Sequence, residues 1–347
     1  MMKALSVLSV PFLLACVLAV RLPAQDDART RTMPEKVAVS EKATSGEKSP
    51  EDGKAASDEK SPEDGKAASG EKAAAADPFA PKPPAGMKLV WSDEFSVDGR
   101  PDPKNWTYET GYVRNHEAQW YRPESAEVKD GCLVITGEHH KQPLPNPRGN
   151  GRRFGFGGNG GDNRPVEYTS ACLITKGLHS FKYGRIEARI KAPLMEGSWP
   201  AFWTLGISEN WPSCGEIDIF EYYKETVLAN FCWSAPGGTW SPEWNTVRTP
   251  LGKFRKDDPE WANKFHVYAM DWDENRIVLS VDGVAVNDSS IAKVKNARFR
   301  SVENPFHQPH YLLVNLALGG DNGGDVTKIP FPVYMYVDYV RVYQKAE

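Results

Sequence analysis

Three carboxylates lie within six residues of this 347-residue chain, in the segment Glu216-Ile217-Asp218-Ile219-Phe220-Glu221. Side chains alternate between the two faces of a regular β-strand, so Glu216 and Asp218 share a face and Glu221 points away from it. One extra residue near Ile219 or Phe220, a β-bulge, would return Glu221 to the face of the other two. We therefore predict a bulged strand that carries three acids on one surface.

Three acids on one surface repel one another, and the repulsion raises the pKa of at least one of them. Such a group is typical of acid/base or nucleophilic chemistry, or of a metal site. In a retaining glycosidase, two carboxyl groups about 5 to 5.5 Å apart act as nucleophile and proton donor. Same-face neighbours in a strand are roughly 6 to 7 Å apart at the backbone, so one bulged strand could supply that pair. Asp218 could hydrogen-bond the nucleophile and keep the pKa of the proton donor high.

The surrounding chain must place these acids on a β-sheet. Turn sequences such as Val281-Asp282-Gly283 separate short alternating segments, and no long amphipathic helix is evident. This pattern predicts an antiparallel β-sandwich. The expected strands are residues 132–136, 185–190, 265–272, 277–281, 311–318 and 334–343. Residues 141–165 are expected to form a long loop, whose Arg148, Arg152 and Arg153 either contact an anionic substrate or keep the loop solvated.

The first quarter of the chain differs from the rest. Residues 1–24 have the charged start, apolar run and small-residue end of a secretory signal. A membrane anchor is an alternative, as is a lipobox at Leu13-Leu14-Ala15-Cys16 that would tether the protein to a membrane through Cys16. Residues 25–84 are polar, contain a 12-residue repeat and are expected to be a disordered linker. Residues 85–347 are a plausible length for one catalytic β-sandwich domain.

Charge and cysteine content narrow the functional classes. The formal net charge is −4 and no basic cluster is present, which argues against a nucleic-acid-binding protein. Cys214 and Cys232 bracket an expected hairpin and are our preferred disulfide pair, with buried free thiols as the alternative. The cysteine spacing matches no zinc site.

Tryptophans flank the acidic segment, and indole faces can stack on sugar rings. Trp199 and Trp203 are the preferred candidates to line a groove, ahead of Trp211, Trp233, Trp240 and Trp244. Asn115 and Glu117 form a polar cluster in an expected loop, which ordinary turn chemistry would also explain.

Together these segments resemble glycoside hydrolase family 16, the laminarinase and lichenase group. The resemblance spans the whole globular part and is carried by Trp91–Phe95, Tyr183–Arg189, Trp199–Trp203, Gly215–Glu221, Pro305–Gly320 and Tyr336–Tyr343. It implies a jelly-roll sandwich with a concave cleft, in which Glu216 is the nucleophile, Asp218 its assistant and Glu221 the general acid/base. The bulged form of the motif is similar to the laminarinase-like branch.

The resemblance also implies that Asn115, Arg185, Trp199 and Trp203 contact sugar. It implies no catalytic cofactor, and a structural calcium held by Glu94, the Gly131 carbonyl and Asp338, although these acids could equally be polar strand ends. Many laminarinase-like members carry histidines in the strand after the acidic motif, whereas this chain has none in Val227–Trp233. Asn230 or Trp233 is expected to take over those sugar contacts.

Three hypotheses follow. The first is a secreted or periplasmic, monomeric endo-glycosidase that cuts β-1,3 or mixed β-1,3/1,4 glucan with retention. The second replaces the substrate by a β-galactan of the agar, porphyran or carrageenan kind. The third is a non-catalytic carbohydrate-binding protein, which the three mutually repelling acids disfavour. Transglycosylation is a further outcome for the first two.

Overall fold

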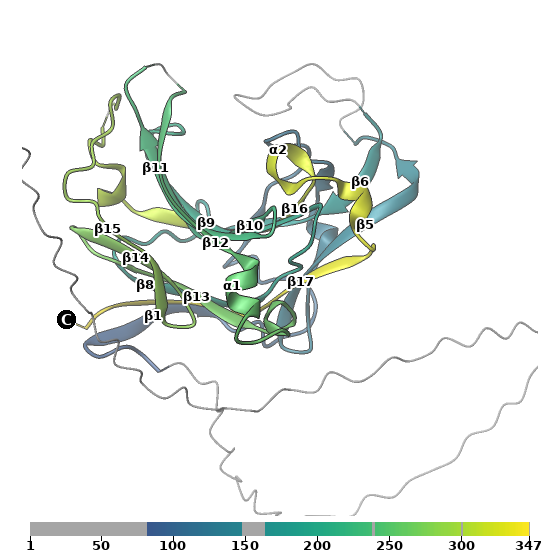
Figure 1. Ribbon diagram of the computed structural model, residues 1–347, viewed down its shortest axis with the longest axis horizontal. Coiled ribbons are helices and arrows are strands. Elements are labelled where there is room, and N and C mark those ends of the chain that lie inside the picture. The colour runs from purple at the N-terminus through teal and green to yellow at the C-terminus, as the bar shows by residue number, and fades with distance from the viewer. Residues whose placement is uncertain (1–81, 148–163, 238–239, 300, 347) are drawn as a thin grey trace, which may run out of the picture. The chain divides into compact units, whose positions relative to one another are not determined.

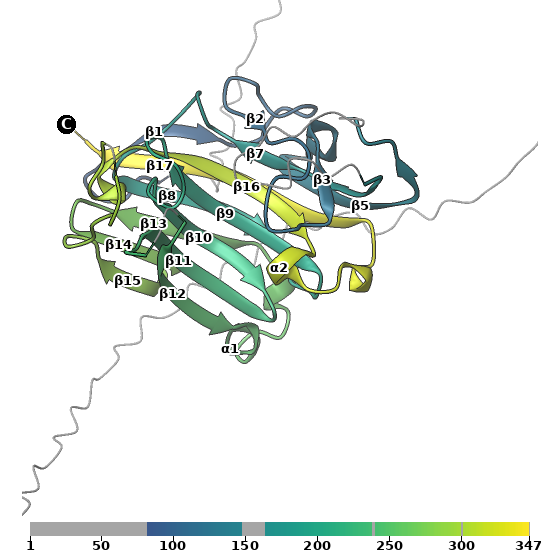
Figure 2. The same ribbon diagram turned by 90° about the horizontal axis from the view of Figure 1, so that it is seen from above.

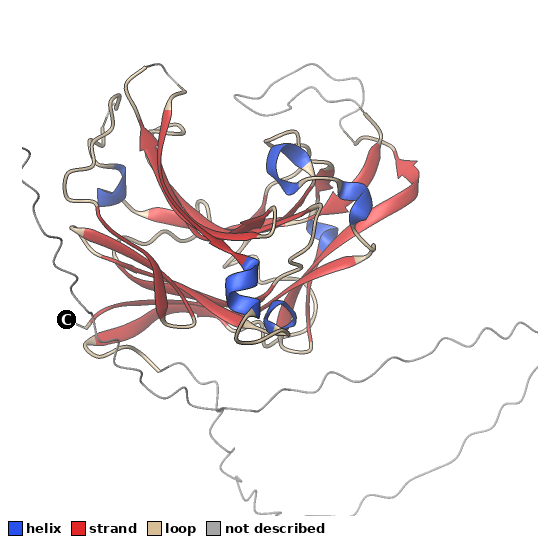
Figure 3. Ribbon diagram, viewed as in Figure 1, coloured by secondary structure: helices blue, strands red, loops and turns tan. Residues whose placement is uncertain are grey.

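The computed structural model describes residues 82–147, 164–237, 240–299 and 301–346. Strands dominate these residues, and the helices are short (Figure 3). All six strand segments expected from the sequence are confirmed. They fall in β5 (Cys132–Leu144), β8 (Gly184–Lys191), β13 (His266–Trp272), β14 (Arg276–Val281), β16 (His310–Leu318) and β17 (Val333–Lys345).

The strands form two sheets that pack face to face (Figure 1), as the predicted jelly-roll sandwich requires. The seven-stranded sheet has the order β12 (Pro242–Pro250), β11 (Thr226–Ser234), β10 (Glu216–Tyr223), β9 (Ser198–Gly206), β16, β7 (Cys172–Ile174) and β2 (Thr107–Tyr108). The ten-stranded sheet has the order β15 (Val284–Ser290), β14, β13, β8, β17, β5, β6 (Val166–Ser170) and β3 (Gln119–Tyr121), with β1 (Met87–Asp93) paired to β17 and β4 (Ala126–Lys129) paired to β5.

Short helical turns connect the strands at the rim. Among the described residues they are α1 (Leu251–Arg255), α2 (Gly320–Gly323) and the 3₁₀ turns η1 (Pro123–Ser125), η2 (Trp261–Asn263), η3 (Pro305–His307) and η4 (Val326–Lys328). Figure 2 shows that α1 and α2 lie at the margins of the seven-stranded sheet and leave its middle uncovered. None of the helices in the described ranges is long and apolar enough to cross a bilayer.

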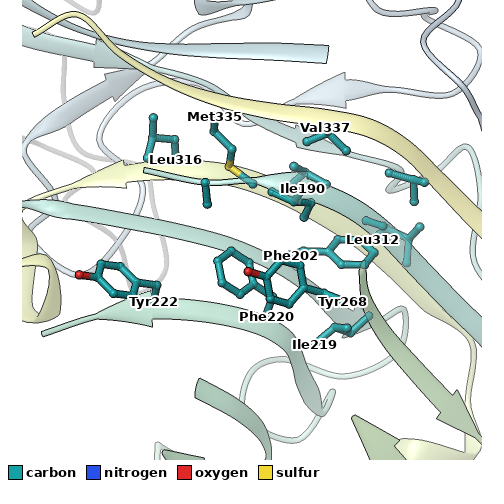
Figure 4. Packing of buried hydrophobic residues seen from close by; sticks show 14 of the residues in the cluster. Ile190, Phe202, Ile219, Phe220, Tyr222, Tyr268, Leu312, Leu316, Met335 and Val337 are labelled. Carbon is teal, nitrogen blue, oxygen red and sulfur yellow. The ribbon is translucent and has the colours of Figure 1, made fainter. Parts of the chain in front are cut away.

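The hydrophobic core fills the space between the sheets. Phe202, Ile219 and Phe220 of the seven-stranded sheet and Met335 of β17 are almost fully buried (Figure 4). The Phe220 ring lies 4.0 Å, centroid to centroid, from the ring of Tyr268 in β13. Burial of this apolar surface holds the two sheets together and fixes which face of β10 points away from the core.

The seven-stranded sheet curves, and its concave side faces away from the ten-stranded sheet (Figure 1). Cross-strand pairing puts matching residues of neighbouring strands in rows across this surface. One row joins Glu216, Cys232 and Trp244, and the next joins Asp218, Asn230 and Thr246. Register therefore places these residues of β10, β11 and β12 side by side across the sheet.

Two predictions about local structure are wrong. The loop expected at 141–165 begins later, because β5 continues to Leu144. The Cys214–Cys232 disulfide is not formed, and the four cysteines of the described residues are free thiols. Cys232 pairs across the sheet with Glu216 rather than with Cys214, so the two cysteines are two residues out of register. Both are buried, and burial raises the pKa of the Cys214 thiol to about 12.

Several sequence predictions lie outside the described residues. These are the signal at 1–24 with its lipobox Cys16, nearly all of the linker at 25–84, and Arg148, Arg152 and Arg153.

Candidate active site

A cleft of about 1130 Å³ lies over the concave sheet. Its floor carries Glu216, Asp218 and Glu221 from β10, and its lining includes Trp199, Trp203 and Asn230 from β9 and β11. The three acids that the sequence singled out therefore face one solvent-connected space.

A β-bulge in β10 brings the acids together. Asp218 pairs with Asn230 of β11 and Glu221 pairs with Leu228, so three steps along β10 match two steps along β11. The pairing of β10 with β9 shifts between Asp218 and Phe220. The predicted bulge is confirmed at the predicted place, and its consequence is that Ile219 and Phe220 pack into the core while Glu221 faces the cleft.

Glu216 is held by Trp211, which the sequence analysis ranked below Trp199 and Trp203. The Trp211 indole N–H donates to Glu216 Oε2 at 2.6 Å. Burial raises the pKa of Glu216, while hydrogen bonds from Trp211 and Asp218 oppose that rise. These donors stabilise the ionised form of Glu216, which is the form a nucleophile needs.

Asp218 is the most deeply buried acid of the three. It is 4% exposed, and burial together with the charges of Glu216 and Glu221 raises its pKa well above the ordinary value. Its hydrogen bond with Glu216 raises its own pKa and lowers that of Glu216. The raised pKa suits Asp218 to carry the proton of the hydrogen bond that it shares with Glu216.

Glu221 is suited to proton transfer near neutral pH. Burial raises its pKa to about 7, and the nearby charge of Glu216 adds to the rise. The Trp199 indole N–H donates to Oε1 at 2.6 Å, and the Asn230 amide donates to Oε2 at 3.0 Å. A carboxyl group with this pKa can give up a proton and take it back at neutral pH.

Four of the six predicted sugar contacts lie in the cleft lining, namely Asn115, Trp199, Trp203 and Asn230. Asn115 lies in the left-handed region with φ 53° and donates weakly to Glu117 Oε1 at 3.4 Å. The Trp203 indole N–H donates to Asn315 Oδ1 at 2.7 Å. Both tryptophans are 7% exposed, so they act as hydrogen-bond donors and cleft walls more than as open platforms.

Two of the predicted sugar contacts lie elsewhere. Arg185 is in β8 of the ten-stranded sheet, where it donates to Glu187 and Asp271 at 2.7 Å each. Trp233 is three residues after Asn230 in β11, and strand alternation turns it to the opposite face, against Phe231 and Phe306. Of the two expected replacements for histidine, Asn230 reaches the cleft and Trp233 does not.

Several cleft residues were missed or ranked too low. Trp240 and Trp244 are 51% and 42% exposed, and the rings of Trp211 and Trp240 stack with centroids 6.3 Å apart. Tyr223, Arg248 and Asn315 also line the cleft. Only the pairing of β10, β11 and β12 shows that Trp244 and Arg248 belong to the cleft. Trp244 lies in the same cross-strand row as Glu216, and Arg248 in the same row as Glu221.

The expected calcium ligands have other partners. Arg341 donates to both carboxylate oxygens of Glu94, at 2.9 and 2.6 Å, and Arg189 donates to Asp338 at 2.8 Å. Within the described ranges no group of three or more His, Cys, Asp or Glu side chains could hold a metal ion. Each of the two acids therefore has an arginine partner, and the calcium site that they would form with the Gly131 carbonyl stays a prediction.

Comparisons with known proteins agree with this geometry. A β-glucanase of Rhodothermus marinus is 36% identical over 282 residues, which cover 75% of this chain and 86% of that protein. A keratan-sulfate endo-1,4-β-galactosidase of Sphingobacterium multivorum is 28% identical, over 74% of this chain and 55% of that protein.

Solved structures are similar over the same part of the chain. One, from work on endo-acting O-glycanases of human gut microbiota, has a TM-score of 0.66 and 31% identity over 76% of this chain and 93% of that one. A non-specific endo-β-1,3(4)-glucanase with 1,3-β-D-cellobiosyl-glucose at its active site has a TM-score of 0.59 and 33% identity, over 76% and 97%.

The family model for glycosyl hydrolases family 16 matches residues 165–339, which include the bulged strand and both of its neighbours. Fold, acid geometry and sequence relatives agree, and the chain is a glycoside hydrolase that belongs to glycosyl hydrolases family 16.

Proposed function

We propose that this glycoside hydrolase cuts β-1,3 or mixed β-1,3/1,4 glucan internally, with retention of anomeric configuration. The observation that carries the mechanism is that the surroundings of Glu216 and Glu221 favour different protonation states. Burial raises the pKa of Glu216, but hydrogen bonds from Trp211 and Asp218 favour its anion, whereas Glu221 has a pKa of about 7 and can be protonated. One acid is thus suited to attack and the other to protonate a leaving group.

In the first step a Glu216 carboxylate oxygen bonds to the anomeric carbon. The bond from that carbon to the glycosidic oxygen breaks, and the Glu221 proton goes to that oxygen. Before this attack Asp218 donates a hydrogen bond to Glu216. The Asp218 proton stays in that hydrogen bond while Glu216 loses its negative charge on forming the ester.

In the second step Glu221, now ionised, removes a proton from water. The water oxygen bonds to the anomeric carbon, and the ester bond to Glu216 breaks. Two inversions at one carbon give net retention. A sugar hydroxyl in place of water would give transglycosylation by the same path.

The shape and lining of the cleft support internal cleavage of a glucan. The exposed indoles of Trp240 and Trp244 offer apolar faces beside Glu216. Sugar rings stack well on such surfaces, and the β-glucanase relative and the β-1,3(4)-glucanase structure supply the substrate class. An open cleft lets a polymer bind along its length, as an endo-acting enzyme requires.

A β-galactan is the second candidate, because of Arg248. Its side chain lines the cleft in the same cross-strand row as Glu221. Its hydrogen-bond partner is the Tyr223 side chain. A guanidinium group in this position can bind a sulfate on the sugar, and the keratan-sulfate galactosidase relative points to the same substrate class.

A substrate panel distinguishes the candidates. Reducing-end release should be measured from laminarin, lichenan, agarose, porphyran, carrageenan and keratan sulfate. We expect laminarin or lichenan to be cut at least tenfold faster than the galactans. The reverse order would favour the second candidate, and binding without cleavage of any polymer would favour the non-catalytic hypothesis.

We also propose export to the periplasm, cell envelope or medium, and a monomeric state. The signal-like sequence at 1–24 supports export, and a polar linker would hold the enzyme away from an attachment point such as Cys16. Cell fractionation, with labelling by a lipid precursor, would separate soluble export from a lipid tether.

A further inference from the structure

Asn230 occupies a central position between two of the three acids. It lies in β11 directly across from Asp218, and only 3% of its surface is exposed. Its Nδ2 group donates to Asp218 Oδ2 at 3.2 Å and to Glu221 Oε2 at 3.0 Å. One amide group thus bridges the two carboxyl groups on either side of the bulge.

This bridge restricts where the protons of Asp218 and Glu221 can lie. An amide N–H can only donate, so Asp218 Oδ2 and Glu221 Oε2 must act as acceptors. The Asp218 proton is then directed to its other neighbour, Glu216, with which it shares a hydrogen bond. At Glu221 the second oxygen already accepts from Trp199, so the catalytic proton must use a lone pair that neither donor occupies.

Among the described residues, the oxygen of the same amide has no hydrogen-bond partner. Asn230 Oδ1 is buried and accepts no hydrogen bond from any described residue. Buried acceptors are nearly always satisfied, and leaving one unsatisfied is unfavourable. Since Asn230 lines the cleft, a hydroxyl group of a bound sugar is the donor that the enzyme's own substrate would supply.

We propose that Asn230 is a positioning residue that fixes the proton pattern of Asp218 and Glu221 and accepts a hydroxyl of the sugar bound at the cleaved bond. The inference rests on the proposed function for the roles of Glu216 and Glu221. It goes beyond that function in making one amide responsible for both acid alignment and sugar recognition.

The expected effect on pH dependence has a definite sign. A hydrogen bond to a carboxylate favours the charged form, so the Asn230 amide lowers the pKa of Glu221. Other groups facing Glu221 are Glu216 and Asp218 of its own strand, Arg248 of β12 and the Tyr223 hydroxyl. Because these stay in place, removal of the amide should raise the pKa of Glu221.

The test compares Asn230→Ala and Asn230→Asp with the matched control Asn287→Ala. Asn287 of β15 is also a buried asparagine beside β11, but it donates to the Ala229 carbonyl at 2.9 Å and lies outside the cleft. The pKa of Glu221 is read by carbon NMR of side-chain-labelled glutamate, assigned with Glu221→Gln. This measurement needs no substrate, and thermal melting shows that each variant is folded.

In Asn230→Ala we expect the Glu221 pKa to rise by up to about one unit, and the alkaline limb of kcat/KM to move with it. In Asn230→Asp the added carboxyl group should raise the Glu221 pKa at least as far, because a second negative charge nearby disfavours ionisation. KM should rise roughly three- to tenfold in Asn230→Ala, which loses the acceptor, and less in Asn230→Asp, which keeps one. Asn287→Ala should lower thermal stability without moving the pKa.

An unchanged Glu221 pKa in both folded Asn230 variants would overturn the positioning role. Equal KM values in Asn230→Ala and the parent would overturn the sugar contact. Failure of the proposed function is recognised separately, because the parent enzyme would then cut none of the panel polymers while the NMR titration still reports on Asn230.

Discussion

Glu216→Ala is expected to lower hydrolysis of the preferred polymer on the order of 10⁴-fold or more, because the covalent path needs a carboxylate at this position. The side chain lies in the cleft with Trp211 donating to one oxygen, so its removal leaves the rest of the acid cluster in place. Initial rates of reducing-end release measure the loss.

Chemical rescue gives this prediction a stereochemical signature. Azide should enter the space left by Glu216 and attack an activated β-glycoside from the same side, giving an α-glycosyl azide of inverted configuration. The matched control is Glu225→Gln, an exposed carboxylate four residues beyond Glu221 that lies outside the cleft and should leave the rate unchanged. Substantial activity in Glu216→Ala without azide would exclude Glu216 as nucleophile.

Glu221→Gln is expected to lower polymer hydrolysis by about 10²- to 10⁴-fold, the usual contribution of a general acid/base. The loss should be smaller for aryl glycosides, whose good leaving groups need little protonation. With these substrates azide should give a β-glycosyl azide of retained configuration, since Glu216 is still present to form the intermediate. An α-azide from this variant would show that the two roles are exchanged.

Glu221 also determines the alkaline limb of the pH profile of kcat/KM. Glu221 must be protonated to act, so kcat/KM of the parent should fall as the pH rises through about 7. Glu216 must be ionised, so kcat/KM should fall at low pH, below the raised pKa of that group. Glu221→Gln should lose the alkaline limb and keep the acid limb. An alkaline limb that persists in Glu221→Gln would mean that another residue is the general acid.

The sequence was sufficient for the features that depend on local spacing. The acids at 216, 218 and 221 needed a bulge to share a face, and β10 has the bulge between Asp218 and Glu221. The alternating segments predicted the strands because one face of each packs on a core. These inferences rest on strand periodicity, which the sequence displays directly.

Features that depend on long-range pairing were harder to predict. Arg185 lies in an expected strand, but nothing in the local sequence shows that this strand belongs to the ten-stranded sheet rather than to the sheet that carries the cleft. Trp233 could have been excluded by parity, since it lies an odd number of residues from Asn230 in one strand. Trp211 reaches Glu216 from the loop before β10, and no periodicity extends into a loop.

Proton NMR of freshly cleaved oligosaccharide tests the double-displacement mechanism most directly. The parent enzyme should be mixed with a β-linked substrate and the anomeric signals followed before mutarotation. If Glu216 forms a covalent intermediate that Glu221 helps to hydrolyse, the β-anomer of the new reducing end appears first and the α-anomer grows in later. Initial release of the α-anomer would mean a single displacement by water and would contradict the assignment of Glu216 as nucleophile.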